Sequence, residues 1–523
     1  MSDDSDATEE LPIVKRARVA MTSEAAPPLD DAVASSAAAA AVRPRPSPAT
    51  CHFVNLPKRR TTWAHGIAIS TLFERPAAEP SGAQIEQAIV GTYLFDPGFV
   101  SEFAPELLRA RRVTLVHGCA GLSAGDVVAA LPNFRVVRPD VPVPFGESMH
   151  HAKYFIMQWA QTLRVVVSTA NATDDYSRRS NQVWMQDFVR CDARTRTSKG
   201  LDFLEQLARY LAAVGLRDWV SVVSAHNFDA VQAHLVCSMP GVFTGHEMAR
   251  YGHLRMRALL SRLQPMPAAF RRPSLMAQFS SLGRTSDAWL FDQWMTSMMP
   301  PTAVAGVAQS AARQTKQTRA ALSERLFLVW PTVAFVRDCF FGYAVGLSLC
   351  GQRASFELDC IRSRLFKFRP QHESRRDITP HMKSYAVFDA SAQGAAVPLA
   401  YYLMTSANLS KQAWGELQKD ESQFVLKNFE LGVVLLQSEV DALSSAPKRA
   451  LLAADRGADR AASLDAPLIV DLRALQRMQF LDGSDGDDDE SPWSFDMQHR
   501  GLDRFGQRNQ VVVQNAERFA RRK

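Results

Sequence analysis

His151-Ala-Lys153 and His381-Met-Lys383 are the two short motifs around which this chain is organised. The first is followed by an apolar run and by Val165-Val-Val-Ser-Thr-Ala-Asn171, the second by Tyr402-Leu-Met-Thr-Ser-Ala-Asn408. Among the 12 histidines, these two alone have a lysine two positions later. The histidines are 381 − 151 = 230 residues apart, and the asparagines 408 − 171 = 237 residues apart. Because one ordered pattern occurs twice, the sequence predicts two similar domains that each supply half of a site.

The spacing of the HxK motif has a physical meaning if each copy lies on a strand. Residues i and i+2 of a strand project from the same face, so each imidazole would lie beside an ammonium group. Each asparagine closes the following strand and can offer its amide donors to the same point. If the halves pack about a pseudo-twofold axis, the six groups form one electropositive pocket that suits a phosphate. The alternative is a structural histidine, a solvated lysine and a turn asparagine in each half, a coincidence that would have to occur twice.

The remaining sequence predicts strands that alternate with helices. Helical patterns occupy 201–211 and 254–263, and six short apolar runs have the character of buried strands: 113–116, 154–157, 163–167, 326–330, 401–404 and 431–436. This order favours an α/β fold of two similar domains, each a mixed sheet sandwiched between helices and related by pseudo-twofold symmetry. We expect a disordered tail at 1–50, the two domains at 51–237 and 238–515, and a basic tail at 516–523.

Composition limits the class of protein. The 523 residues are 46% hydrophobic and 22% charged, as is usual for globular proteins, and the net charge of +6 permits a polyanionic partner. No apolar run reaches the 18 or more residues that a membrane span needs, so we expect no membrane association. The seven cysteines include no CxxC pair, which indicates a reducing compartment. The acidic start is unlike a secretion signal, and Lys15-Arg-Ala-Arg18 has the basic spacing of a nuclear import signal.

Two histidines about one phosphorus atom suggest a division of labour. One neutral imidazole attacks phosphorus and becomes a phosphohistidine, while the other, protonated, donates to the leaving oxygen and later takes a proton from water. Lysines and asparagines would stabilise the negative charge of the transition state, a role that a metal often performs elsewhere. We therefore expect no metal and no cofactor. The chain has no HExxH, GxxxxGK[ST] or GxSxG motif, so zinc proteases, P-loop NTPases and α/β-hydrolases have no local support.

These residues resemble the phospholipase D superfamily, whose signature is HxKx4D in two copies. The aspartate positions hold Gln158 and Phe388 here. Loss of both aspartates is typical of the tyrosyl-DNA phosphodiesterase 1 family, and the string Thr405-Ser-Ala-Asn-Leu-Ser-Lys-Gln-Ala-Trp-Gly415 is similar to that family's second motif. Further similar landmarks occur in the same order: 115–118, 150–153, 238–241, 251–253, 278–283 and 429–433. The similarity extends from about residue 51 to 510.

The resemblance implies a role for each residue that matches a family motif. His151 would be the nucleophile and His381 the general acid and then base. The phosphate clamp would be Lys153, Lys383, Asn171 and Asn408, with Gln182 and Glu430 orienting the imidazoles, although the sequence does not say which orients which. DNA would be bound by Ser280, Ser281, Gly283 and Ser410, with Phe145 stacking on a base.

The resemblance also implies a substrate. It is a DNA 3′ end joined through a phosphodiester to tyrosine, left by stalled topoisomerase I, so the partners would be DNA with 3′-tyrosyl or other 3′ blocking adducts and a topoisomerase-derived peptide. We expect a monomeric, metal-independent DNA repair enzyme in the nucleus that leaves a 3′-phosphate. The rivals are a phospholipase D-like lipid hydrolase, which would be expected to keep the motif aspartates, and a DNA-binding or scaffold protein with a decayed site.

Two features outside the motifs bear on DNA and adduct binding. Residues 362–369 interleave basic and aromatic side chains just before His381, as expected of a groove that contacts phosphates and stacks bases, or of a basic surface strand. Where the family reads D-x-x-G-x-x-W near its C-terminus, this chain has Asp503, Gly506 and Asn509, so we expect the aromatic contact with the adduct to be absent or supplied by Trp493.

Overall fold

The structure is a computed structural model. It describes residues 49–56, 66–118, 122–140, 148–191, 194–262, 270–304, 316–370, 375–392, 397–439, 472, 475–478, 480 and 489–509. The two tails expected at 1–50 and 516–523, apart from residues 49 and 50, lie outside these ranges, as does Phe145. Within the described ranges, no helix combines the length and the apolarity needed to cross a bilayer.

The first domain is built on a seven-stranded sheet with the order β1-β7-β6-β5-β2-β3-β4. The neighbours β2, β3 and β4 are parallel, and the other pairs are antiparallel. Its elements in chain order are β1 (Ala49–Phe53), η1 (Ile69–Leu72), β2 (Gln87–Thr92), α2 (Pro97–Phe103), α3 (Glu106–Arg109), β3 (Arg112–His117), α4 (Ala124–Ala130), β4 (Phe134–Val137), β5 (Tyr154–Gln158), β6 (Thr162–Ser168), α5 (Asp175–Arg178), β7 (Gln182–Val189), α6 (Ser198–Ala213) and α7 (Asp218–Ser224).

The second domain repeats this plan in a seven-stranded sheet with the order β12-β11-β10-β13-β14-β17-β8. Its elements are β8 (His234–Ser238), β9 (Gly241–Thr244), η2 (Gly245–Arg250), α8 (Gly252–Ser261), β10 (Pro273–Gln278), η3 (Ala288–Met295), α9 (Thr296–Met298), α10 (Pro301–Val304), α11 (Lys316–Ser323), β11 (Leu326–Trp330), α12 (Val333–Asp338), η4 (Gly342–Ser348), α13 (Arg353–Phe356), α14 (Asp359–Arg362), β12 (Leu365–Lys367), β13 (Lys383–Asp389), β14 (Leu399–Thr405), α15 (Lys411–Trp414), β15 (Glu416–Gln418), β16 (Gln423–Leu426) and β17 (Glu430–Leu436). Strands β15, β16 and β9 form a small separate sheet.

The two large sheets correspond strand for strand. Read from the opposite end, the second sheet runs β8-β17-β14-β13-β10-β11-β12, and each pair has the same relative direction as its counterpart in the first. Strand β5 therefore corresponds to β13, β6 to β14 and β7 to β17. The duplication that the two HxK motifs predict is a duplication of the whole sheet, and the α/β fold of two similar domains is confirmed.

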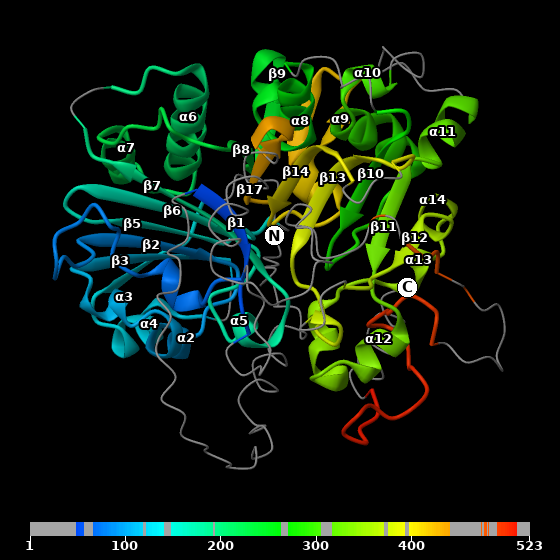
Figure 1. Cartoon of the computed structure of the whole chain (residues 1–523), viewed down its shortest axis with the longest axis horizontal. Coiled ribbons are helices and arrows are strands. Elements are labelled where there is room, and N and C mark those ends of the chain that lie inside the picture. The colour runs from blue at the N-terminus through cyan, green and yellow to red at the C-terminus, as the bar shows by residue number, and fades with distance from the viewer. Residues whose placement is uncertain are drawn as a thin grey trace, which may run out of the picture.

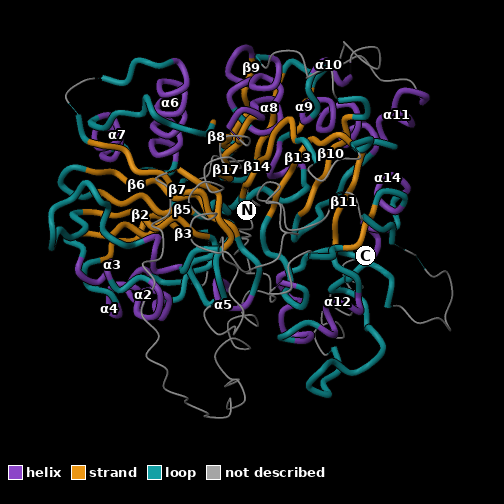
Figure 2. Tube along the Cα trace, viewed as in Figure 1, coloured by secondary structure: helices purple, strands orange, loops and turns teal. Residues whose placement is uncertain are grey.

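Both sheets bury both faces, which explains their nearly continuous apolar strands. Along β5, Tyr154 and Ile156 belong to one core cluster and Phe155 and Met157 to another. Helices α6 and α7 lie on one side of the first sheet and α2, α3 and α4 on the other (Figure 1). The same layering of helices around strands is visible in both domains when helices and strands are coloured separately (Figure 2). Alternate residues of one strand thus meet different layers.

Helix α6 joins the two domains. Thr197 accepts a hydrogen bond from the Gly200 backbone N–H at 3.1 Å and caps the helix. Phe203, Leu207, Tyr210 and Leu211 recur at helical spacing and are fully buried. Phe203 packs against Trp184 and Phe188 of the first sheet, while α6 also lies against β8 of the second. The core at the domain junction is therefore continuous between the sheets.

Two expectations about boundaries need correction. Strand β8 pairs with β17, so the boundary expected between residues 237 and 238 falls inside a strand of the second sheet, and the chain changes sheets before His234. The HxK motifs, expected on strands, instead precede them, except that Lys383 is the first residue of β13. Strand β5 begins at Tyr154 and β13 at Lys383, because the extended segment before each strand bonds to the other domain instead of to its own sheet.

Candidate active site at the domain interface

Each HxK segment is attached to the opposite domain by a short parallel bridge. His151 N–H donates to the Phe429 carbonyl at 3.0 Å, and Phe429 N–H donates to the Met149 carbonyl at 3.0 Å. In the other half, His381 N–H donates to the Ser180 carbonyl at 3.0 Å, and Ser180 N–H donates to the Thr379 carbonyl at 2.9 Å. Backbone pairing of this kind fixes both histidines at one interface.

The two motif lysines are held in equivalent ways. Lys153 and Lys383 are buried, and each Nζ donates to the backbone carbonyl of its own motif histidine. Burial, together with the facing ammonium of Lys383, lowers the pKa of Lys153 well below its usual value. Burial also lowers the pKa of Lys383 to about 8. Glu430 and Asp175 oppose this effect of burial, and a bound anion beside the two lysines would favour their charged forms further.

The two asparagines are also equivalent. Asn171 Oδ1 accepts from the Leu94 N–H at 3.4 Å. Asn408 Oδ1 accepts from the Ser280 and Ser281 N–H groups at 3.1 and 3.0 Å. Both oxygens are thus held by the loop that follows the strand next to the HxK strand, β2 or β10. The backbone N–H groups of Ser280 and Ser281 thus orient the side chain of Asn408. In Asn171 and Asn408 the side-chain NH2 group is then the one that can donate to a ligand.

His151 is oriented by a carboxylate of the other domain. Its Nδ1 lies 3.0 Å from Glu430 Oε2. Ser406 Oγ donates to the same oxygen at 2.5 Å, and Asn428 Nδ2 donates to Oε1 at 3.2 Å. Burial alone would raise the pKa of Glu430, but His151 and Lys153 outweigh it and lower that pKa. An ionised carboxylate only accepts, so it holds the proton on Nδ1 and leaves Nε2 of His151 as the nucleophilic nitrogen.

His381 lies against a residue that the sequence did not single out. Its Nδ1 is 2.7 Å from Oδ2 of Asp175, the first residue of α5 in the first domain. Gln182, expected to orient one of the two imidazoles, accepts a hydrogen bond from the Tyr402 hydroxyl at 2.5 Å through Oε1. Glu430 therefore faces His151, and Asp175, which the sequence did not single out, faces His381.

Gln182 and Glu430 occupy equivalent positions in the two domains. Gln182 is the first residue of β7, as Glu430 is the first residue of β17, and β7 and β17 correspond. The two halves differ because the Tyr402 side chain reaches Gln182 from β14. No sequence signal singled out Asp175, because it stands in a polar stretch, and its 1% exposure is a property of the fold.

Burial lowers the pKa of both motif histidines. It lowers the pKa of His151, against the opposing effect of Glu430. It lowers the pKa of His381 to about 3, against the opposing effect of Asp175. Burial thus favours the neutral form of both imidazoles. A phosphodiester brings negative charge next to both rings and would raise both pKa values.

The residues expected to hold the DNA backbone lie beside Asn408. Gly283 packs so closely on Ser410 that a Cβ at this glycine would come within 2.6 Å of the serine Cβ. Ser410 Oγ accepts from the Ala413 N–H at 3.2 Å and caps α15. Gly283 and Ser410 line a cavity of about 390 Å³ that also includes three cationic side chains: Arg284, Lys411 and Lys427. The structure thus brings Ser280, Ser281, Gly283 and Ser410 together next to the site.

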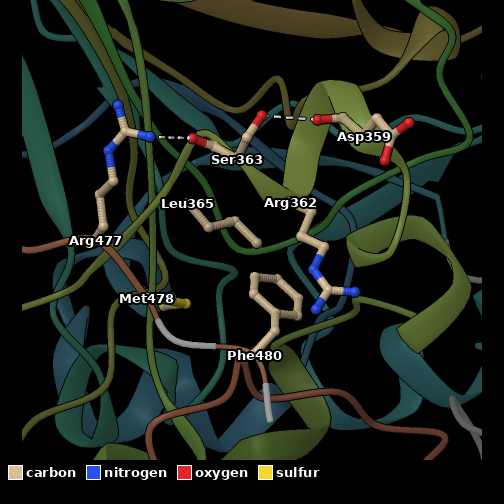
Figure 3. A pocket seen from close by; sticks show the side chains of 7 residues that line it. All are labelled: Asp359, Arg362, Ser363, Leu365, Arg477, Met478 and Phe480. Carbon is tan, nitrogen blue, oxygen red and sulfur yellow. Dashed lines mark hydrogen bonds between the residues drawn. The ribbon is translucent and has the colours of Figure 1, made fainter. Parts of the chain in front are cut away.

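The basic and aromatic stretch at 362–369 lies elsewhere. It contains β12, an edge strand that is separated from β13 by β11 and β10. Arg362 lies over the Phe480 ring at 4.7 Å, and Arg477 donates to the Ser363 carbonyl at 3.0 Å (Figure 3). These side chains line a cavity of about 530 Å³ at the sheet edge. The alternative interpretation, a basic surface strand, fits Arg362 and its neighbours better than a groove leading to the histidines.

Trp493 does not fit its expected contact with an adduct. It is 1% exposed and stacks on Tyr343 with ring centroids 5.7 Å apart, while its Nε1 donates to the Gly346 carbonyl at 3.2 Å. The indole is therefore part of the core. In the part of the chain that the structure describes, no three His, Cys, Asp or Glu side chains are grouped as metal ligands.

Comparison with known proteins agrees with this geometry. Two domains with one strand order and an HxK half-site in each define a two-domain phospholipase D-like protein, and a solved structure of yeast tyrosyl-DNA phosphodiesterase shares the fold. Its TM-score is 0.56 at 18% identity, over 74% of this chain and 89% of the yeast chain. The family profile described as tyrosyl-DNA phosphodiesterase matches residues 52–473. The chain belongs to the tyrosyl-DNA phosphodiesterase family.

Two relatives show the extent of the sequence similarity. The tyrosyl-DNA phosphodiesterase 1 of Arabidopsis thaliana is 29% identical over 368 residues, which are 68% of this chain and 57% of the plant protein. The probable tyrosyl-DNA phosphodiesterase of Caenorhabditis elegans is 29% identical over 362 residues, which are 66% of this chain and 74% of the worm protein. The match thus spans little more than half the length of the plant relative.

Proposed function

We propose that this chain is a DNA repair phosphodiesterase that hydrolyses the 3′-phosphotyrosyl bond between a DNA 3′ end and topoisomerase I, leaving a 3′-phosphate. The observation that carries the proposal is the pairing of two equivalent half-sites across one interface. Each half supplies a histidine, a buried lysine and an asparagine whose Oδ1 is held by backbone N–H groups, and Glu430 holds His151 through Nδ1. The family to which the chain belongs supports the substrate class.

In the first step, the Nε2 lone pair of His151 attacks phosphorus. The bond between phosphorus and the tyrosine oxygen breaks, and the departing oxygen takes a proton from protonated His381. The products are a phosphohistidine that carries the DNA and a neutral tyrosine side chain. Lys153, Lys383 and the two asparagine amides would bind the equatorial oxygens, on which negative charge accumulates.

In the second step, His381 is neutral and takes a proton from the attacking water. The new bond joins the water oxygen to phosphorus, and the bond between phosphorus and His151 breaks. DNA leaves with a 3′-phosphate, His151 is neutral again and His381 is protonated for the next cycle. The two steps together consume only the phosphodiester and one water molecule.

The cavity next to Asn408 supports a path for the DNA strand. Arg284, Lys411 and Lys427, whose combined charge exceeds that of the Glu416 paired with Lys411, would neutralise backbone phosphates. We further propose that the protein acts as a monomer, accepts a topoisomerase-derived peptide as leaving group, and works in the nucleus, where this substrate arises.

The proposal is tested with a 5′-labelled oligonucleotide that ends in a 3′-phosphotyrosine. Wild-type protein should convert it to the 3′-phosphate, identified by its mobility and by its sensitivity to a 3′-phosphatase. Tight DNA binding without conversion would support the binding-module alternative and refute the proposal. If neither binding nor conversion occurs, release of a phospholipid headgroup from vesicles would identify the lipid hydrolase rival.

Chelation of metals is expected to leave the rate unchanged. Lys153, Lys383 and the two asparagine amides supply the electrostatic stabilisation that a metal ion would otherwise provide. An excess of EDTA should therefore change kcat by less than about twofold. The measurement is kcat before and after chelation and dialysis. A loss of activity that added Mg²⁺, Mn²⁺ or Zn²⁺ restores would contradict this mechanism.

The pH dependence should be bell-shaped, because one imidazole must be neutral and the other protonated. Burial lowers both histidine pKa values, and the negative charge of a bound phosphodiester raises them. The profile of kcat, which reports the substrate complex, should therefore lie at higher pH than the profile of kcat/KM, which reports the free protein. Steady-state rates from pH 4 to 10 test this shift. A flat profile, or a displacement of kcat toward lower pH, would count against two titrating histidines.

A further inference from the structure

The carboxylate of Asp175, which faces His381, is surrounded by hydrogen-bond donors. Asp175 Oδ1 accepts from Arg179 Nη1 at 2.6 Å, and Oδ2 accepts from the Asn171 N–H at 3.2 Å. The His381 Nδ1 lies 2.7 Å from the same Oδ2. Asp175 is 1% exposed and Arg179 is 6% exposed, so solvent cannot supply these contacts. The carboxylate thus connects the first clamp asparagine, through its backbone, with the second motif histidine.

The location of Asp175 mirrors that of Glu430. Glu430 comes from the second domain and faces His151 of the first, whereas Asp175 comes from the first domain and faces His381 of the second. Asp175 does so from α5 instead of from the strand position that Gln182 occupies. Each imidazole therefore faces a carboxylate that belongs to the other domain. The two carboxylates do not occupy corresponding positions in the duplicated fold.

We propose that Asp175 is the positioning residue for His381, and that it holds the proton on Nδ1 so that Nε2 faces the phosphate. This inference rests on the proposed function, because it assigns the tautomer of the group that serves as acid and base. An imidazole with its proton on Nδ1 has a free Nε2 lone pair, which is what is needed to take a proton from water in the second step.

The charges around His381 favour this assignment. Asp175 and Arg179 face it from the first domain, and Lys383 faces it from its own strand. Cys350 lies near Lys383, and burial raises the pKa of its thiol, so it adds no negative charge. Burial alone would raise the pKa of Asp175, but His381 and Arg179 outweigh it and lower that pKa, so the side chain is a carboxylate.

The contact between His381 and Asp175 is close but bent. Oδ2 is 2.7 Å from Nδ1, yet it lies away from the direction in which Nδ1 points a proton. Contacts of catalytic groups often become straighter when substrate binds. A small rotation of the ring would align this one, and the backbone bond from His381 to Ser180 keeps the ring within reach.

Replacing Asp175 with asparagine should reverse the tautomer. The side-chain oxygen of Asn would remain with Arg179, because a buried guanidinium needs an acceptor more than a neutral ring does. The NH2 group would then face His381 Nδ1, which becomes an acceptor, and the proton moves to Nε2. Without a free Nε2 lone pair the second step slows by about 10²-fold or more, and the phosphohistidine accumulates.

The experiment compares Asp175→Asn with the matched control Asp174→Asn. Asp174 is the preceding residue and also pairs with the arginine four positions later, at 2.6 Å from Arg178, but it does not face His381. We expect a covalent protein–DNA adduct with the 3′-phosphotyrosyl oligonucleotide for Asp175→Asn and none for Asp174→Asn. Normal turnover without an adduct in a folded Asp175→Asn protein would overturn the proposal.

A second measurement needs neither the variant nor the substrate. ¹⁵N-histidine spectra of the wild-type protein at pH 7 report the tautomer of His381, whose signal is assigned by its loss in His381→Asn. We expect the proton on Nδ1. A proton on Nε2 would refute the role of Asp175 even if the enzyme is active. If the tautomer is as expected and the tyrosyl oligonucleotide is not cleaved, the proposed function fails and the positioning role does not.

Discussion

A protein in which His151 is replaced with alanine is expected to release no tyrosine from 3′-phosphotyrosyl DNA. His151 Nε2 supplies the electron pair that displaces tyrosine, and alanine offers none. The remaining lysines, asparagines and His381 can bind the phosphate but cannot form the intermediate. We expect the single-turnover rate to fall by about 10⁴-fold or more, equivalent to about 5.5 kcal/mol of transition-state stabilisation.

The chain offers a matched control in the adjacent histidine. His150 is also buried, but its Nδ1 lies 3.2 Å from the Thr92 carbonyl and its Nε2 lies 3.4 Å from the Tyr210 hydroxyl. Burial lowers its pKa to about 3, as expected of a neutral ring in a core. His150→Asn should lower thermal stability while keeping the rate within about tenfold of wild type. If His151→Ala keeps more activity than His150→Asn, the nucleophile is misassigned.

A protein in which His381 is replaced with asparagine is expected to form the intermediate and then fail to release it. The first step suffers less from the lost acid, because a tyrosine phenol, with a pKa of about 10, leaves readily as the anion. The second step suffers more, because water, with a pKa of about 15.7, is a poor nucleophile without a base to take its proton. We expect the second step to slow by about 10²- to 10⁴-fold, so that protein and DNA stay joined.

The adduct can be followed by denaturing gel electrophoresis. Labelled DNA should migrate with the His381→Asn protein and be released by acid, since a phosphorus–nitrogen bond to histidine is acid-labile. The double variant His151→Ala with His381→Asn should give no adduct, which distinguishes a covalent bond from tight binding. Normal turnover by His381→Asn without any adduct would refute the acid and base role of this histidine.

Much of this site could be predicted because the sequence contains the half-site motif in two copies. The order of HxK, apolar strand and Ala-Asn predicted a duplicated half-site, and the structure shows the same sheet twice, with β5 and β13 in equivalent places. Short apolar runs predicted strands well because both faces of each sheet are buried. The strand at 326–330, for example, has the bounds of β11.

The carboxylate partner of His381 could not be predicted in the same way. The resemblance to the family indicated Gln182, which begins the strand equivalent to that of Glu430. Asp175 reaches His381 from α5, an element that the motifs do not include. The contact between Asp175 and His381 depends on how the two domains pack. A local sequence motif cannot predict it.

The stretch at 362–369 shows a different limit. Alternation of basic and aromatic residues predicts a strand with one charged and one apolar face. The pattern does not say which part of the fold lies next to that strand. Its position at the outer edge of the second sheet follows from the order of strands, which periodicity does not specify. The aromatic side chain of Phe366 instead packs on Phe327 of the neighbouring strand, with ring centroids 4.7 Å apart.

The most direct test of this account is to locate the DNA on the trapped protein. The adduct formed by His381→Asn is digested with nuclease and protease under alkaline conditions that preserve phosphohistidine, and the modified peptide is sequenced by mass spectrometry. The account predicts a nucleotide joined through its 3′-phosphate to His151. Attachment to any other residue would contradict the assignment of the nucleophile, and with it the mechanism of the paired half-sites.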